Sequence, residues 1–345
     1  MNNPSTSSGQ KRIRIAINGF GRVGRPAFKI ALEKDDLEVV AINDLADNET
    51  LAHLLKYDSV YGRYDKKVSA TETEIVVDGK SFPVYEEKDP DKLPWKKHEV
   101  DVVLECTGKF VKDNLANKHI DAGAKRVILS APAKGEGGAD MLLLGVNHEN
   151  YKDQTIVSNA SCTTNCIAPP VKVLLKEFGI KKGMMTTIHS YTADQRLIDS
   201  PHKDLRRARA AALNIIPTTT GAARATGKTI PEVKGIFDGM AVRVPTVVGS
   251  LSDITLLVEK KTTIEEVNKA LTDAANSPTF KGIMEVTNDP IVSSDIIGNT
   301  HSSIVDLSLT NVLDGDMVKI IAWYDNEIGY SNRLVEMAQL VGKSL

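Results

Sequence analysis

The chain has 345 residues and a formal net charge of −2, with 41% hydrophobic and 26% charged residues, a length that accommodates roughly two domains at about 100–200 residues each. The small net charge provides no positive field for nucleic acid, and no apolar stretch approaches the ~20 residues that cross a bilayer. Three cysteines cannot build a disulfide framework, so we expect a reducing, cytoplasmic location.

The N-terminal part of the chain predicts a disordered tail followed by a parallel sheet. Residues 1–10, MNNPSTSSGQ, are polar and lack the apolar region of a secretory signal. Beyond them, short apolar runs alternate with helical stretches, the first of which is a helix at 21–34. The runs lie at 12–18, 37–43, 100–105 and 126–130. Unbroken apolar strands between helices are typical of a parallel sheet that is covered on both faces.

Two other stretches depart from this pattern. Residues 63–86 alternate, are rich in Thr and Val, and contain an Asp-Gly turn at 78–79, which indicates a small antiparallel insertion. After about residue 160 the expected strands are longer and the helices are set apart, which indicates an α+β domain. These strands lie at 183–190, 239–244, 252–259, 303–309 and 317–324, with helices at 263–275 and, amphipathic and C-terminal, at 331–345.

A glycine-rich turn joins the first strand to the first helix. It reads Gly19-Phe20-Gly21-Arg22-Val23-Gly24. In this context a G-x-G-x-x-G pattern indicates dinucleotide binding: the first glycine allows a tight turn, the second lets the backbone approach a pyrophosphate, and the third allows close helix–strand packing. The N–H groups at the helix start then face the anion.

An acidic residue at the end of the second strand supports the same interpretation. Asp44 lies 20 residues after Gly24, where a carboxylate bonds the ribose hydroxyls of an adenosine. A 2′-phosphate at this point would meet a like charge, so the sequence favours NAD over NADP. The alternative is a glycine-rich turn with a capping aspartate.

The densest polar cluster, SNASCTTNC, occupies residues 158–166 and precedes an apolar run. Ser, Thr and Asn favour helix starts, and a cysteine at a helix N-terminus has a lowered pKa because the helix dipole stabilises its thiolate. We therefore identify Cys162 as a candidate nucleophile, with a buried, unreactive thiol as the alternative. Cys106 and Cys166 fit that alternative, since one ends an apolar strand and the other lies one turn after Cys162. Two prolines at 169–170 leave two helix starts open, at Ser161 with a kink or after the prolines.

A thiolate nucleophile needs a base, and His189 is the best candidate among the seven histidines. It ends a strand run beside a loop, where catalytic side chains collect, although a lone histidine is more often structural. A nucleophilic thiol beside a nicotinamide suits aldehydes, because thiolate addition gives a hemithioacetal that can lose hydride and leave a thioester. His189 would take the thiol proton and then assist hydride transfer. No CxxC or HExxH pattern competes as a zinc site.

Hydroxyl-rich loops and arginines provide candidate anion positions. Thr192 and Asp194 lie in one loop, the segment TTTG at 218–221 forms another, and Arg243 ends an apolar strand where a buried guanidinium needs an anionic partner. The alternative for each is a turn or a helix cap. The basic cluster at 206–209 is either an anion site or a solvated helix face, and it lacks the aromatics of a nucleic-acid site.

Together these motifs resemble the phosphorylating glyceraldehyde-3-phosphate dehydrogenases from about residue 11 to the end of the chain. The most specific element is ASCTTNC at 160–166. The supporting elements are INGFGRVGR (17–25), SAPAKG (130–135), HSYTADQR (189–196), NIIPTTTGAA (214–223), RVPT (243–246) and WYDNEIGYSNR (323–333).

The resemblance implies an α/β fold in which a Rossmann domain with a doubly wound parallel sheet spans residues 11–161 and is completed by a C-terminal helix at 327–345. An α+β catalytic domain would span residues 162–326. The implied activity is the glycolytic oxidation of glyceraldehyde 3-phosphate by NAD and inorganic phosphate to 1,3-bisphosphoglycerate and NADH. The implied assembly is a homotetramer, in which the loop at 190–215 reaches a neighbouring subunit's cofactor, with no nucleic acid or membrane partner.

The family's motifs also imply roles for individual residues. Cys162 is the nucleophile and His189 the base, and no metal is involved. Substrate and phosphate positions fall on Ser161, Thr163, Thr192, Asp194, Arg207, Thr220, Gly221 and Arg243. Cofactor positions fall on Gly19, Phe20, Gly21, Arg22, Val23, Gly24, Asp44, Lys88, Ser130 and Asn326, the last of which holds the nicotinamide amide.

Two departures from the family pattern bear on cofactor choice: Lys88 stands where an arginine is common near the adenine, and Ser200 where NAD-specific members commonly have leucine. Three alternatives follow. One is an enzyme that uses erythrose 4-phosphate and water, and another is an NADP-linked biosynthetic enzyme, against which Asp44 argues. The third is an RNA- or protein-binding module, against which the near-neutral charge argues.

Overall fold

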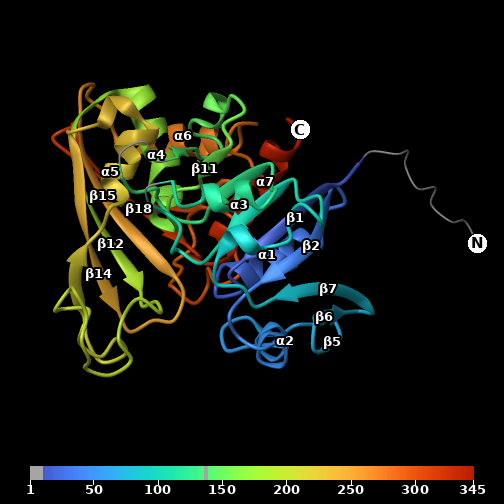
Figure 1. The fold of residues 1–345 in the computed structure, drawn as a ribbon. Helices are drawn as coiled ribbons and strands as arrows, with labels where there is room; N and C mark the ends of the chain where they lie inside the picture. The colour runs from blue at the N-terminus through green and yellow to red at the C-terminus, as the bar shows by residue number, and fades with distance from the viewer. Residues whose placement is uncertain (1–10, 113, 136–138) are drawn as a thin grey trace, which may run out of the picture.

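Two large sheets dominate the computed structural model, which describes residues 11–112, 114–135 and 139–345. Figure 1 shows the first sheet in blue and cyan and the second in yellow, orange and red. The predicted α/β class, with a Rossmann sheet and a second domain of mixed α and β structure, is confirmed. The predicted tail at 1–10 lies outside the described residues.

The first sheet has the doubly wound order of a dinucleotide-binding fold. Its inner strands are parallel and lie in the order β7-β2-β1-β8-β9-β11, so the chain builds outward from β1 to one side and then to the other. The predicted strand at 37–43 coincides with β2, and the other three predicted strands differ from the observed ones by one or two residues. These strands are β1 (Ile13–Asn18), β2 (Leu37–Asn43), β7 (Lys80–Tyr85), β8 (Val102–Glu105), β9 (Arg126–Leu129) and β11 (Ile156–Ser158); β10 (Asp140–Met141) lies beside β11, and β6 and β5 continue the sheet beyond β7.

The predicted antiparallel insertion follows β2. Strand β6 (Glu74–Val77) pairs antiparallel with β5 (Val68–Ala70) and with β7. The β6–β7 turn has φ of +48° at Asp78 and +83° at Gly79, the two positive values that a type I′ hairpin turn requires. The chain reaches the insertion through elements that we did not predict: α2 (Asn48–Lys56), β3 (Tyr57–Asp58) and β4 (Gly62–Arg63).

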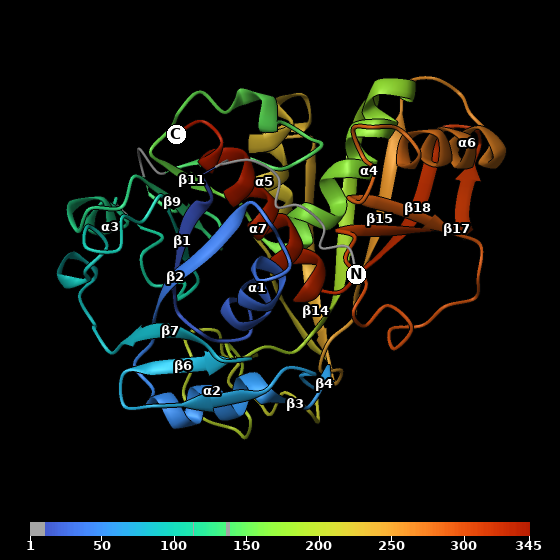
Figure 2. The same cartoon turned by 90° about the vertical axis from the view of Figure 1, so that its right-hand side faces the viewer.

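Helices α1 (Gly24–Ala31) and α7 (Ile328–Gly342) pack against each other and the first sheet. Figure 2 shows α7, in red, beside α1. Its buried Leu334 and Met337 join one apolar cluster with β1 and β2, and a Cβ added at Gly342 would lie only 2.4 Å from the Ile13 side chain. The predicted C-terminal helix therefore packs on the nucleotide-binding sheet. Helix α3 (Asn117–Asp121) lies against the short 3-10 segment at Pro90–Lys92.

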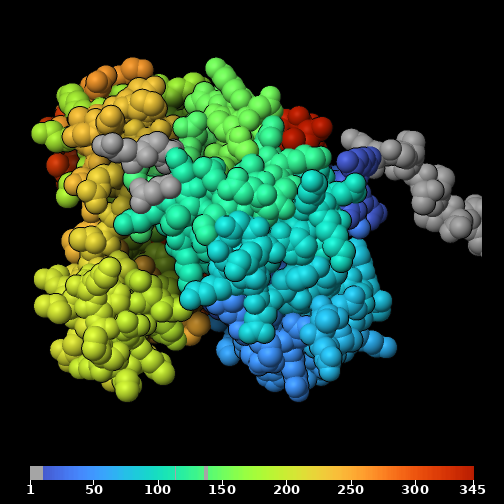
Figure 3. Space-filling model, in the orientation of Figure 1, coloured from blue at the N-terminus to red at the C-terminus, as the bar shows by residue number. Residues whose placement is uncertain are grey.

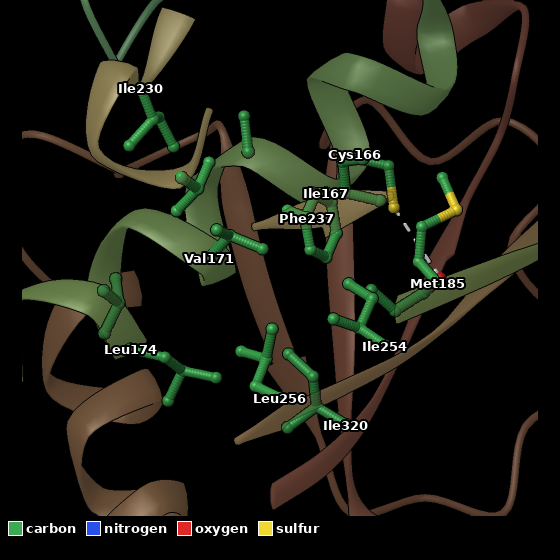
Figure 4. Close-up of a cluster of buried hydrophobic side chains, with 14 of the residues drawn as sticks. Cys166, Ile167, Val171, Leu174, Met185, Ile230, Phe237, Ile254, Leu256 and Ile320 are labelled. Atoms are coloured by element: carbon green, nitrogen blue, oxygen red, sulfur yellow. Dashed lines mark hydrogen bonds between the residues drawn. The ribbon is translucent and has the colours of Figure 1, made fainter. Parts of the chain in front are cut away.

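The second sheet is mostly antiparallel, in the order β13-β14-β12-β15-β18-β17-β16, with β12 parallel to β14 and β16 parallel to β17. Helices α4 (Cys162–Phe178), α5 (Ala222–Thr229) and α6 (Ile264–Ala275) pack against it around one large apolar cluster. Figure 4 shows the side chains of this cluster between α4 and the strands. The strands are β12 (Ile180–Ser190), β13 (Ile216–Thr219), β14 (Phe237–Val244), β15 (Ser250–Val258), β16 (Met284–Thr287), β17 (Ser303–Leu313) and β18 (Met317–Tyr324).

Helix α4 begins at Cys162 and continues through Pro169 and Pro170. Of the two helix starts that the sequence left open, the structure therefore has the earlier one, with Ser161 as the N-cap. The Ser161 hydroxyl accepts a hydrogen bond from the Thr164 backbone N–H at 3.1 Å, which satisfies one free donor of the first turn. The thiol of Cys162 consequently lies on the first turn of the helix.

Candidate active site

The glycine turn after β1 has the geometry that the sequence predicts. Gly19 has φ of +94°, and a Cβ there would lie 2.8 Å from the Thr107 backbone nitrogen. A Cβ on Gly24 would lie 2.0 Å from the Gly19 carbonyl oxygen, so only glycine allows α1 to pack this closely on the turn. A Cβ on Gly21 would meet no atom within 4 Å, so this glycine faces open space where a ligand can approach the backbone.

The start of α1 is free to bind an anion. Its N-cap, Val23, makes no side-chain capping bond, and the first turn carries no acidic residue. The turn is fixed from the side of β2, because the Asp44 carboxylate accepts hydrogen bonds from the Phe20 and Ala46 backbone N–H groups at 2.6 and 3.1 Å. Asp44 therefore lies beside the turn, on the edge where the predicted adenosine contact belongs.

Arg22 contributes to the turn differently from its neighbours. Its guanidinium donates to both carboxylate oxygens of Glu327, at the start of α7, and to Asp58 at 2.5 Å. These two carboxylates raise the pKa of Arg22 above its ordinary value in spite of burial. The side chain is thus held by its protein partners, Glu327 and Asp58.

The other predicted cofactor residues lie at the ends of strands. Lys88 is exposed in the loop after β7, and Ser130 directly follows β9, with its N–H bonded to the Glu105 carbonyl oxygen. Since the carboxyl ends of parallel strands share one edge of a sheet, both residues lie on the same edge as Gly19 and Asp44.

Asn326 lies beyond β18 of the second sheet and is held in one orientation. Its Oδ1 accepts hydrogen bonds from the Ser190 hydroxyl at 2.7 Å, the Ser250 hydroxyl at 3.0 Å and the Gly249 N–H at 3.2 Å. These donors fix the amide so that its Nδ2 group is the part left to donate to a ligand. Ser190 adjoins His189, so the amide lies next to the catalytic candidates.

The two catalytic candidates are in contact. The Sγ of Cys162 lies 3.5 Å from Nε2 of His189, which is 5% exposed. The thiol comes from the first turn of α4 and the imidazole from the end of β12, so the contact depends on how that helix start packs against the sheet. A buried thiol–imidazole pair at this distance can pass a proton.

The neighbours of His189 define its protonation. Its Nδ1 lies 2.7 Å from the Ser190 carbonyl oxygen, which can only accept, and 3.1 Å from Nη1 of Arg243, which can only donate; the shorter contact favours the tautomer with the proton on Nδ1. Burial and the nearby Arg243 charge lower the pKa of His189 to about 3, so the ring is neutral at pH 7. Nε2 therefore presents a lone pair toward Cys162 and can act as the base.

The thiol itself does not behave as we expected. A helix N-terminus predicts a lowered pKa, but burial raises the pKa of Cys162 above its ordinary value. The Arg243 charge and hydrogen bonds from Thr163 oppose this rise without cancelling it. Desolvation outweighs the helix start here, so a nucleophilic role for this thiol would require the adjacent histidine as its base.

Arg243 lies beside the pair, because β12 and β14 are parallel neighbours and their register places Arg243 next to His189. Its Nη1 donates to the Ser190 carbonyl oxygen at 2.9 Å and to the Thr192 hydroxyl at 3.4 Å. The Nε of Arg243 is buried and has no protein partner. The structure thus brings together Cys162, His189, Thr192 and Arg243. The Arg243 side chain adds a positive charge to this group.

A second group forms around Arg207. Its guanidinium donates to the Thr218 hydroxyl at 3.0 Å, to the Thr219 carbonyl oxygen at 3.1 Å and to the Asp194 carboxylate. This contact contributes to the lowered pKa of Asp194. The segment 206–209 is not helical, and its other two arginines are exposed, so Arg207 is the one that faces the threonine loop. Thr220 and Gly221 then lead into α5.

The sequence analysis missed the residues that support these groups. The Tyr324 hydroxyl lies 2.9 Å from the Thr163 hydroxyl and 2.8 Å from the Thr187 hydroxyl, and its ring packs edge-on against His189. Tyr324 ends a strand two residues before Asn326, and that spacing was the available signal. Ser190 was also missed, although it directly follows the candidate base.

The remaining cysteines are packed thiols, as the sequence predicts. All three cysteines are free. Burial raises the pKa of both Cys106 and Cys166. Figure 4 shows Cys166 turned from α4 into the apolar cluster that contains Ile254 and Ile320. Within the described part of the chain, no group of His, Cys, Asp and Glu side chains is arranged to hold a metal ion, and no helix has the length and apolarity to cross a bilayer.

The molecular surface is hollowed between the two halves of the chain. Figure 3 shows a recess between the yellow segment of the second half and the blue and cyan segments of the first. The two halves are also joined, since the Tyr61 hydroxyl donates to the Asp325 carboxylate at 2.9 Å and Arg22 bonds Glu327. The cofactor turn and the catalytic pair are therefore parts of one connected structure.

Comparison with known proteins identifies two matching family models. Residues 13–113 match the NAD binding domain of glyceraldehyde 3-phosphate dehydrogenase, and residues 161–326 match its C-terminal domain. Curated relatives named glyceraldehyde-3-phosphate dehydrogenase include those of Geobacillus stearothermophilus, 54% identical over 331 residues (95% of this chain and 98% of the relative), and Thermotoga maritima, 57% identical over 333 residues (96% and 99%). The relative from Streptomyces coelicolor is 54% identical over 336 residues, 96% of this chain and 99% of the relative.

Proposed function

The chain belongs to the glyceraldehyde 3-phosphate dehydrogenase family, and from that premise we propose that it oxidises glyceraldehyde 3-phosphate to 1,3-bisphosphoglycerate with NAD and inorganic phosphate. The observation that carries the proposal is the 3.5 Å contact between the Cys162 thiol and Nε2 of His189. It supplies a nucleophile and a base in one place, which an alcohol dehydrogenase does not need.

The described residues fit NAD. Gly21 leaves open space above the turn, α1 has an uncapped start, and Asn326 holds an oriented amide donor next to His189. Asp44 would bind the adenosine ribose and disfavour a 2′-phosphate. When bound, NAD⁺ supplies the hydride acceptor. The residues after β1 and β2 would hold the pyrophosphate and the adenosine, and the Asn326 amide would hold the nicotinamide amide next to His189.

The chemistry of the protein residues follows from their protonation. His189 takes the thiol proton, the sulfur of Cys162 adds to the aldehyde carbon, and the protonated ring returns the proton to the carbonyl oxygen, so that a C–S bond forms as the C=O π bond becomes a C–OH bond. Loss of hydride from this hemithioacetal restores C=O and leaves a thioester, while His189 assists removal of the hydroxyl proton. A phosphate oxygen then attacks the thioester, the C–S bond breaks, and the acyl phosphate leaves Cys162 as thiolate.

Two groups of anion donors support the use of two phosphates, one on the substrate and one as co-substrate. Arg243 and Thr192 form the group at the thiol–imidazole pair, and Arg207 and the threonine loop form the other. Ser161 and Thr163, on the first turn of α4, and Gly221, before α5, add hydroxyl and backbone donors at helix starts. We propose that these residues, together with Asp194 and Thr220, bind the phosphate groups.

Steady-state assays test this function. We expect NADH formation from glyceraldehyde 3-phosphate that requires inorganic phosphate, with kcat/KM for NAD well above that for NADP. Turnover that is undiminished without phosphate, or faster with erythrose 4-phosphate, would replace the proposal with water as the acyl acceptor. A higher kcat/KM for NADP would indicate the biosynthetic enzyme instead.

We also propose the domain division and the assembly. Residues 11–161 with 327–345 form the NAD-binding domain and residues 162–326 the catalytic domain. The loop at 190–215 exposes large apolar side chains, among them Leu197 and Leu213 at 82% and 83% exposure, which supports burial against another subunit. Light scattering of the purified protein tests for a homotetramer. The free state of all three cysteines supports a cytoplasmic location.

A further inference from the structure

The connection between β11 and α4, immediately before Cys162, contains a strained residue. Strand β11 ends at Ser158, α4 begins at Cys162, and between them Ala160 has φ of +52°. In this left-handed region the Cβ of an L-residue crowds the following carbonyl oxygen. The other described non-glycine residues with positive φ are all Asp, Asn or Glu. Ala160 is also fully buried, so neither solvent nor a polar side chain of its own explains its conformation.

Hydrogen bonds hold the backbone on both sides of Ala160. The Ser158 hydroxyl accepts from the Ala160 N–H at 3.1 Å and donates to the Ala131 carbonyl oxygen at 2.8 Å. The Asn165 amide donates to the carbonyl oxygens of Asn159 and Ser161, at 2.9 and 3.0 Å. The residues before and after the strained position are therefore tied to the sheet and to the first turn of α4.

The strained residue itself is held from the C-terminal helix. The Tyr330 hydroxyl, on the first turn of α7, donates to the Ala160 carbonyl oxygen at 3.1 Å, and Tyr330 is 4% exposed. The same helix begins just after Asn326, and its N-cap Glu327 binds Arg22 of the glycine turn. Through α7, one rigid element contacts both the cofactor turn and the backbone that precedes the nucleophile.

The geometry of the thiol depends on this connection. His189 is fixed within β12, so the position of Sγ relative to Nε2 is set by where α4 starts, which the turn at 159–161 determines. We propose that the left-handed Ala160, clamped by Tyr330, positions Cys162 for proton transfer to His189. The proposal rests on the function of Cys162 proposed above. The Tyr330 hydroxyl acts on Cys162 through the Ala160 carbonyl group, so we assign it a positioning role.

A conservative variant tests the clamp. Tyr330→Phe removes the hydroxyl and keeps the ring, and we expect kcat to fall by about tenfold, the scale of one lost buried hydrogen bond, with the KM for NAD and for the aldehyde unchanged. The rate constant for alkylation of Cys162 by iodoacetamide should fall to a similar extent near pH 7 and recover at alkaline pH, where the thiol ionises without His189. Tyr151→Phe is the matched control, because its hydroxyl bonds Ser344 at the far end of α7, and it should match the wild-type protein in every measurement.

A second variant keeps the test decisive if Tyr330→Phe folds poorly. Ala160→Gly relieves the steric crowding and admits other backbone conformations, so we expect a thermal midpoint within a few degrees of wild type and a several-fold slower alkylation near pH 7. Wild-type kcat and alkylation profiles in the folded variants would overturn the clamp, as would losses that follow thermal stability without a change in the pH profile. Cys162→Ser separates the two ideas: if it stays active the proposed function fails, whereas an inactive Cys162→Ser with unaffected Tyr330→Phe and Ala160→Gly refutes the clamp alone.

Discussion

The β1–α1 turn and the β11–α4 connection follow the same plan with different residues. In each, a parallel strand ends, one residue adopts a positive φ, and a helix starts at the carboxyl edge of the sheet; the residues are Gly19 at +94° and Ala160 at +52°. At Gly19 a Cβ would strike backbone atoms of a neighbouring loop, so glycine is required. At Ala160 a methyl group is accommodated, and side chains from other elements hold the backbone.

The difference in residues between the two turns corresponds to a difference in the groups that each turn presents to a ligand. In the proposed function the first turn exposes backbone N–H groups to a phosphate, and Gly21 leaves the space above them open. The second presents one side chain, the Cys162 thiol, whose usefulness depends on its distance from His189. Backbone movement would impair phosphate binding at the first turn less than it would impair the second connection. A thiol that shifts away from His189 loses its base.

We expect the largest effect on kcat from removing the Cys162 thiol, which the β11–α4 connection presents. Cys162→Ser should lower kcat by at least roughly 10³-fold, because a hydroxyl is a far weaker nucleophile and a poorer acyl carrier than a thiol. Cys106→Ser, at the end of β8 on the other sheet, serves as the control and should retain activity. Burst and steady-state NADH formation measure both, and nearly full activity in Cys162→Ser would remove the thiol from the mechanism.

The glycine turn can be dissected with two alanine substitutions that the structure distinguishes. Gly24→Ala places a methyl group 2.0 Å from the Gly19 carbonyl oxygen, so it should lower the free energy of unfolding by about 1–3 kcal/mol, as overpacking does, and raise the KM for NAD. Gly21→Ala meets no protein atom within 4 Å, so it should leave stability unchanged and still raise the KM for NAD by obstructing the pyrophosphate.

Denaturant unfolding and NAD titration separate these outcomes. Equal stability losses in the two variants would show that Gly21 is a structural glycine like Gly24. Normal NAD affinity in Gly21→Ala would mean that the pyrophosphate does not bind above Gly21. The β1–α1 turn would then have no phosphate-binding role to compare with the role of the β11–α4 connection.

The charge of Arg243, beside the Cys162 thiol, should affect both aldehyde binding and the ionisation of the thiol. Arg243→Gln should lower kcat/KM for the aldehyde by about 10- to 100-fold, the range for one charge-assisted hydrogen bond. Because the Arg243 charge opposes the burial that raises the Cys162 pKa, its loss should move the alkylation profile of Cys162 to higher pH. Arg207→Gln, in the second anion group, is the matched comparison and should leave that profile in place. An unchanged profile in Arg243→Gln would mean that the guanidinium does not influence the thiol.

We expect a smaller effect on the choice between NAD and NADP when Asp44 is replaced. Asp44→Ala removes the charge that a 2′-phosphate would meet, so the ratio of kcat/KM for NADP to that for NAD should rise by about tenfold. The Phe20 N–H loses its 2.6 Å acceptor at the same time, so the KM for NAD should also increase. A constant ratio, measured with the two cofactors under matched conditions, would show that Asp44 only holds the turn.

The elements and the principal site residues could be predicted because they rest on local pattern. The bounds of β2 and β18 follow from unbroken apolar runs, and the roles of Gly19 and Gly24 follow from spacing alone. Contacts between distant segments could not be predicted. Tyr330 lies 170 residues from Ala160, and Glu327 lies 305 residues from Arg22. Neither the Tyr330–Ala160 contact nor the Arg22–Glu327 contact therefore leaves a signal in the local sequence.

The error over the Cys162 pKa has the same origin. Position at a helix start is readable from the sequence, and it predicts a lowered pKa. Burial is a property of the whole fold, and here it is the larger influence and raises the pKa. The helix start of α4 was likewise left open because local proline chemistry disfavours a helix that tertiary packing nevertheless stabilises through Pro169 and Pro170.

The smallest expected effect concerns stability in mild acid. Burial lowers the pKa of His189 from an ordinary value of 6.5 to about 3, so between these values the unfolded chain binds a proton that the folded chain does not. Stability should therefore fall as the pH drops below about 6.5, by roughly 1 kcal/mol from this residue at about pH 5.5. His189→Gln should lose less stability than wild type between pH 7 and pH 5.5, whereas His53→Gln, an exposed histidine on α2 beside the first sheet, should follow wild type. Thermal midpoints at the two pH values measure this, and parallel behaviour of all three proteins would mean that His189 is not neutral and buried, which would also remove it as the base that Cys162 needs.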